Sequence, residues 1–131
     1  MSNNEFYNLF ERQAENQRLI CKKELYKGFI SEEENNDIVY GGLPVDNTRL
    51  ASYHIQQLVS EIGEVLDADK RWKNMRNDKY DKDAKVEELA DCFIVLMNVC
   101  MFSDISSADI YNAISKKIDD VKERIESAKD N

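Results

Sequence analysis

Two stretches decide how this chain folds: LVSEIGEVLDADKRW at residues 58–72 and KVEELADCFIVLMNVC at residues 85–100. In both, apolar residues recur at the spacing that places them along one side of an α-helix. Glycine occurs only four times and proline once in 131 residues, while Glu, Lys, Asp, Leu and Ile are abundant. The two stretches therefore predict neighbouring helices, and the composition favours an all-α fold.

The rest of the chain extends this prediction to one domain spanning residues 1–131. An approximate apolar stripe marks a first helix that is expected to stop at Gly28, and Ser106 or Ser107 is expected to cap the last helix. Residues 28–47 form the main irregular stretch. The four predicted helices cover about residues 4–27, 48–70, 84–102 and 107–128.

The third predicted helix changes character along its length. From Cys92 to Phe102 only Asn98 is strongly polar, and a helix that is apolar all round is buried on all sides. We expect it at the centre of the fold and at a subunit interface, because three short neighbours cannot cover it. A homodimer or homotetramer is therefore predicted. The expected inner face of the fourth helix consists of Ile110, Ala113, Ile114, Ile118, Val121 and Ile125.

Charge and cysteine usage exclude several classes of protein. The net charge is −8, so the basic face that a nucleic-acid duplex requires is not expected. The longest apolar run, Cys92–Met97, is far too short to cross a membrane, and the polar N-terminus lacks the features of a signal peptide. Cys21, Cys92 and Cys100 form no C-x-x-C spacing. Reduced thiols in a cytoplasmic protein are the expected state.

Two acidic pairs are the strongest candidates for chemistry. Glu61 and Glu64 share one helix face, as do Glu88 and Asp91, although like charges at this spacing repel. Asp91 directly precedes the apolar run, where a carboxylate is costly unless it is paired or bound to a metal. Pairs on neighbouring helices can converge on one cation, and ligation by oxygen alone suits Mg²⁺ or Mn²⁺.

Two alternatives compete with this metal site. The chain has 26 acidic residues, so acidic pairs at this spacing also occur on solvated helix faces. A di-iron bundle would need Glu-x-x-His pairs, and the single histidine, His54, has no glutamate three or four residues away. A solvated acidic face therefore remains the main alternative, and His54 is expected to be a surface or core histidine.

The motifs Glu61-Ile-Gly-Glu64 and Glu88-Leu-Ala-Asp91 resemble those of the all-α nucleoside triphosphate pyrophosphohydrolases, the MazG-like and dimeric dUTPase superfamily. The resemblance spans roughly residues 48–126. It implies an oligomeric, four-helix-bundle-like MazG-type fold and Mg²⁺-dependent hydrolysis of a nucleoside triphosphate to the monophosphate and pyrophosphate. All four carboxylates would hold metal, or one of the first pair, Glu61 or Glu64, would orient the attacking water.

The chain departs from the family pattern at two positions. Ser60 stands where many members carry an acidic residue, and Val121 replaces an asparagine that many MazG-like members have between counterparts of Lys117 and Arg124. The base and sugar are left open between a dUTP-specific diphosphatase, a dCTP- or purine-preferring enzyme and a phosphoribosyl-ATP hydrolase. From a different class, a non-catalytic helical interaction protein is the alternative.

Substrate contacts are predicted from residue type and position. Cations must hold the triphosphate, and Trp72 is a candidate for stacking on the base or for anchoring its loop. Asn98 would either read a base edge or, as we favour, form a hydrogen bond with Asn98 of a second subunit across an interface. The predicted substrate-binding residues are Trp72, Lys73, Arg76, Asn98, Lys117 and Arg124, with Lys116 as a further cation.

Overall fold

The computed structural model describes residues 3–22, 48–73 and 79–128, and all regular elements among them are helices. The all-α prediction is therefore confirmed. The elements are α1 (Asn3–Lys22), α3 (Thr48–Ala68), the short 3₁₀ helix η1 (Lys70–Trp72), α4 (Lys82–Phe102) and α5 (Ser107–Ala128). The second predicted helix ends two residues early, the third begins two residues early, and the predicted stretch 28–47 lies outside the described residues.

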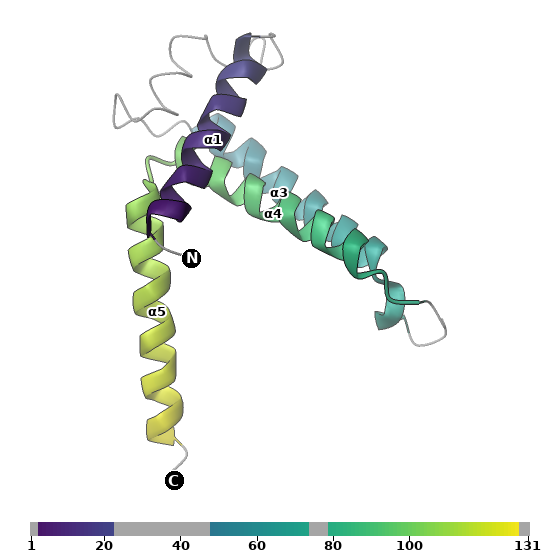
Figure 1. Cartoon of the computed structure of the whole chain (residues 1–131), viewed down its shortest axis with the longest axis vertical. Helices are drawn as coiled ribbons and strands as arrows, with labels where there is room; N and C mark the ends of the chain where they lie inside the picture. Colours follow the sequence, from purple (N-terminus) through teal and green to yellow (C-terminus); the bar gives the residue numbers. More distant parts are fainter. Residues whose placement is uncertain (1–2, 23–47, 74–78, 129–131) are drawn as a thin grey trace.

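Helices α3 and α4 form a long antiparallel pair, and α1 crosses one end of it (Figure 1). The buried core lies at that end. It contains Phe10 and Ala14 of α1, Leu50 and Ala51 of α3, and Cys100, Met101 and Phe102 of α4. The other end of the pair, where η1 lies, is far from this core along the helices (Figure 1).

Local side-chain hydrogen bonds explain where α4 and α5 begin. The Asp81 carboxylate accepts the Ala84 backbone N–H at 3.1 Å, which caps α4. At the start of α5, the Ser106 hydroxyl accepts the Asp109 backbone N–H at 3.1 Å, and Asp109 accepts the Ser106 N–H at 3.2 Å. This reciprocal capping box confirms Ser106 as the cap. Between the two helices, Asp104 adopts a left-handed φ of 58° that turns the chain.

Helix α5 diverges from the α3–α4 pair, which leaves two apolar faces uncovered within the single chain that were expected to be buried (Figure 1). Only Ile110 of the expected inner face packs against the core, while the remaining five residues of that face are exposed. On α4, Phe93, Ile94 and Leu96 are also exposed, so this helix is not enclosed within the single chain. The reason is that α5 leaves the core after its first turns, where Tyr111 contacts Phe6 of α1. A closed four-helix bundle is therefore not seen within the described chain.

Among the described helices, none combines the length and the apolarity that a membrane crossing requires.

Candidate metal centre

The helix pair brings the four predicted carboxylates together. Glu61 and Glu64 come from α3, and Glu88 and Asp91 come from α4. One oxygen of each lies within 4.8 Å of the corresponding oxygens of the other three. The i,i+3 spacing explains the convergence, because it turns both residues of each pair toward the neighbouring antiparallel helix.

The surroundings of the cluster raise the pKa of two of its carboxyl groups, Glu61 and Glu88. Burial raises the pKa of Glu61, and repulsion from Glu64 and Asp91 raises it further. A hydrogen bond with Glu64 raises the pKa of Glu88, with burial and the neighbouring charges adding to the effect. One oxygen each of Glu61 and Glu88 is buried and has no hydrogen-bond partner among the described residues. Unsatisfied buried acceptors are costly, and a cation would supply their missing partner.

The donor set fits a hard divalent cation. All four groups offer carboxylate oxygen, which is the ligand type that Mg²⁺ and Mn²⁺ prefer. Glu87, next to Glu88, is exposed and lies outside the cluster. Cys92 is buried beside the cluster, and burial together with the four negative charges raises the pKa of its thiol. Its sulfur is also a soft donor, which Mg²⁺ and Mn²⁺ do not prefer.

A group of charged and aromatic residues lies at the η1 end of the helix pair, and we call Asp69, Arg71, Tyr80 and Lys85 the clasp. Asp69 accepts hydrogen bonds from Arg71 Nε and Nη2, both at 2.8 Å, and from Lys85 Nζ at 2.9 Å. The Arg71 guanidinium lies over the Tyr80 ring, 3.8 Å from its centroid. Arg71 and Lys85 together hold the pKa of Asp69 far below its usual range. Sequence reasoning missed the clasp because Asp69 and Lys85 are 16 residues apart in the sequence, a separation at which no helical spacing relates them.

Trp72 is attached to the end of α3. Its indole Nε1–H donates to the Leu66 carbonyl at 3.1 Å, although the ring itself remains exposed. Lys73 Nζ lies 5.2 Å from the centroid of the Trp72 ring. The anchoring role foreseen for Trp72 is therefore present, and the exposed face of the ring leaves base stacking as a proposal. Arg76 lies outside the described residues.

Asn98 is buried and finds hydrogen-bond partners in its own chain. Its Oδ1 accepts from Gln13 Nε2 at 2.9 Å and from Gln17 Nε2 at 3.1 Å, and both glutamines are buried on α1. Neither a nucleobase nor a second copy of Asn98 is needed to satisfy this oxygen. The interaction fastens α1 to α4 at the core end of the pair, which gives Asn98 a structural role.

His54 is buried in the core, which is one of the two positions predicted for it, surface or core. Its ring stacks on Phe102, with centroids 5.2 Å apart, and meets Tyr53 edge-on at 5.1 Å. Its Nδ1 lies 3.3 Å from Gln57 Oε1. Burial lowers the pKa of His54, so the neutral form is favoured in the folded protein.

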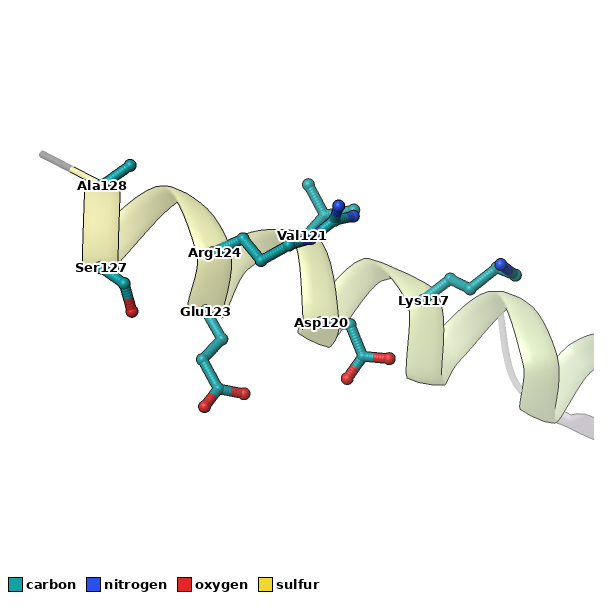
Figure 2. A pocket seen from close by; sticks show the side chains of 7 residues that line it. All are labelled: Lys117, Asp120, Val121, Glu123, Arg124, Ser127 and Ala128. Atoms are coloured by element: carbon teal, nitrogen blue, oxygen red, sulfur yellow. The ribbon is translucent and has the colours of Figure 1, made fainter.

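Lys117 and Arg124 line a depression on α5 (Figure 2). All the lining residues come from this one helix, so no other element of the described chain walls the depression. Lys116 lies on the same helix, where its ammonium pairs with Asp120 at 2.8 Å. Helix α5, which carries Lys117 and Arg124, diverges from the α3–α4 pair, which carries the four carboxylates (Figure 1).

Comparison with known proteins adds no further information about this site. No family model matches the chain, and neither the curated proteins nor the solved structures contain a match.

Proposed function

We propose that this chain is a Mg²⁺-dependent hydrolase that converts a nucleoside triphosphate to the monophosphate and pyrophosphate. The observation that carries the proposal is the convergence of Glu61, Glu64, Glu88 and Asp91. Four carboxylates that share so small a volume repel one another, and a bound divalent cation relieves this repulsion. The resemblance of the two motifs to those of the all-α pyrophosphohydrolases supports the choice of reaction.

The four carboxylates would hold Mg²⁺, or Mn²⁺ in its place. When bound, the ion neutralises charge on the phosphate oxygens and makes nearby water easier to ionise. In the alternative arrangement, Glu61 or Glu64 does not bind the ion but orients a water molecule toward the α-phosphorus and accepts its proton. A bond forms between the water oxygen and the α-phosphorus, the bond from that phosphorus to the bridging oxygen breaks, and pyrophosphate leaves.

Substrate contacts are assigned at the η1 end of the helix pair. The exposed Trp72 ring offers a stacking surface for a nucleobase, and the Lys73 ammonium beside it offers a positive charge to the triphosphate. Arg76 is a further candidate. Lys117 and Arg124 can serve the same purpose only from α5 of a second copy of the chain. A dUTP-specific diphosphatase is one form of this proposal.

We further propose that the chain works as a homodimer or homotetramer. Large apolar side chains are exposed along three helices, among them Val59 of α3, Phe93 of α4 and Ile118 of α5, which are 68%, 67% and 62% exposed. Apolar surface arranged along whole helix faces marks a protein–protein interface rather than ordinary surface. Self-association covers it, as it does in many small helical proteins.

Turnover of a nucleotide panel tests the function. The full-length protein is incubated with each NTP and dNTP in the presence of Mg²⁺, and release of monophosphate and pyrophosphate is measured. We expect hydrolysis that EDTA abolishes. Absence of turnover for every nucleotide at high enzyme concentration would refute the proposal.

A matched pair of variants tests the site. Glu88→Gln removes one carboxylate of the cluster, whereas Glu87→Gln removes the adjacent, exposed carboxylate outside it. We expect the first variant to lose activity and the second to keep it, with both retaining helical circular dichroism. If the chain is instead a non-catalytic interaction protein, Mg²⁺ should leave the melting temperatures of the wild type and of both variants unchanged.

A further inference from the structure

Lys85 lies close to the candidate metal centre in sequence and in space, yet it pairs elsewhere. It stands three residues before Glu88 on α4, a spacing at which Lys and Glu side chains normally meet. Its ammonium instead bonds Asp69 at 2.9 Å, across the gap between the two helices. A cation beside four carboxylates would be expected to move onto them unless another group held it.

Asp69 is well suited to hold that cation. Its side chain is only 9% exposed, and it accepts two hydrogen bonds from the Arg71 side chain, one from the Arg71 backbone N–H and one from Lys85. Stacking of Arg71 on Tyr80 keeps the guanidinium in place beside Asp69. The Asp69 carboxylate is thus fixed at the position where Lys85 reaches it.

We propose that Asp69 is a positioning residue that holds the Lys85 ammonium away from the four carboxylates and so keeps them available to a divalent cation. The inference rests on the proposed metal site. In the absence of the Asp69 charge, Glu88, one turn further along α4, offers the Lys85 ammonium an acidic partner, and an ammonium bound there neutralises one ligand and repels the metal ion.

Two possible roles of the Asp69–Lys85 pair predict different effects of mutation on metal binding. If the Asp69–Lys85 pair served only to fix the distance between α3 and α4, loss of either partner would weaken metal binding. If Asp69 restrains a competing cation, loss of Asp69 weakens binding, but removal of Lys85 as well restores it. The second behaviour cannot arise from structural support alone, because the double variant lacks the pair entirely.

The experiment measures Mn²⁺ affinity by isothermal titration calorimetry, with the metal alone and the full chain. We expect Asp69→Asn to weaken binding about three- to fivefold, the effect of one new ion pair at an exposed site. Asp69→Asn/Lys85→Met is expected to return to the wild-type affinity. Lys85→Met alone, which keeps the Asp69–Arg71 pair, is expected to bind at least as tightly as the wild type.

A control variant tests whether the effect is specific to Asp69. Glu15→Gln removes one negative charge from a surface pair with Arg18 on α1 and is expected to leave Mn²⁺ affinity unchanged. The inference is overturned if the wild type binds Mn²⁺ but Asp69→Asn binds equally well, if the double variant stays as weak as Asp69→Asn, or if Lys85→Met binds more weakly than the wild type. A wild-type protein that binds no Mn²⁺ would instead refute the metal site itself, and the inference with it.

Discussion

Glu61 on α3 and Glu88 on α4 each bury one carboxylate oxygen that has no hydrogen-bond partner among the described residues. These two residues belong to different motifs, so the repulsion in the candidate metal centre acts across the helix pair as well as along each helix. Without metal, the folded protein therefore bears an electrostatic free-energy cost at this centre, separate from the energetics of helix formation.

Divalent metal is expected to stabilise the protein through this centre. At 100 times its dissociation constant, an ion that binds only the folded state adds about 2.7 kcal/mol to the free energy of unfolding. We expect Mg²⁺ or Mn²⁺ to raise the melting temperature of the wild type. Differential scanning calorimetry with and without the ion measures the effect, and an unchanged melting temperature at millimolar metal would contradict it.

Glu61→Gln is expected to have opposite effects in the two states. Without metal, the uncharged amide relieves repulsion from Glu64 and Asp91, so the melting temperature in EDTA should rise. With metal, one ligand is missing, so the additional stabilisation by Mg²⁺ should be reduced or lost. Asp67→Asn removes an exposed charge of the same helix and serves as the control. A lower melting temperature for Glu61→Gln in EDTA would mean that the carboxylates do not strain the fold.

Sequence periodicity was sufficient to predict the convergence of the four carboxylates but not the contacts around them. The i,i+3 spacing alone places Glu61 beside Glu64 and Glu88 beside Asp91, and two consecutive helices pack antiparallel, so the convergence was predictable. The clasp depends on a contact between Asp69 and Lys85, which are 16 residues apart in the sequence, and no local spacing encodes such a contact. Likewise, periodicity locates the apolar stripe of α5 but does not reveal what covers it, and most of this predicted inner face is exposed in the single chain.

Asn98 offers a test of the core end of the helix pair. Asn98→Ala removes the acceptor that the Gln13 and Gln17 amides share in a buried position. Because a buried donor that loses its acceptor costs about 1–3 kcal/mol, we expect a loss of this order in the free energy of unfolding. Urea denaturation measures it, with the exposed Asn112→Ala as the control. Equal stability of the two variants would show that the buried amides find other partners.

His54 predicts a pH dependence of stability. Burial lowers the pKa of His54 in the folded protein, whereas the unfolded chain binds a proton near a pH of about 6.5. The unfolded state therefore holds more protons as the pH falls below that value, and the free energy of unfolding should decrease by at most about 1.4 kcal/mol per pH unit until the folded pKa is reached. Urea denaturation in EDTA between about pH 7 and pH 5, on the wild type and His54→Gln, isolates this contribution as a difference. Parallel curves for the two proteins would contradict it.

Exposed isoleucines on α5 are expected to control the assembly. Ile118 and Ile125 are each 62% exposed and lie on the same side of the helix as Ile114 and Val121, so this stripe has no cover within the described chain. Placing a carboxylate at a covered apolar position is strongly unfavourable, whereas at a solvated position it changes stability little. We expect Ile118→Asp/Ile125→Asp to reduce the mass measured by light scattering while helical circular dichroism persists. Ser115→Asp, an exposed position outside the stripe, should leave the mass unchanged. A wild-type protein that is already monomeric, or a double variant with the wild-type oligomeric mass, would show that α5 does not join copies of the chain.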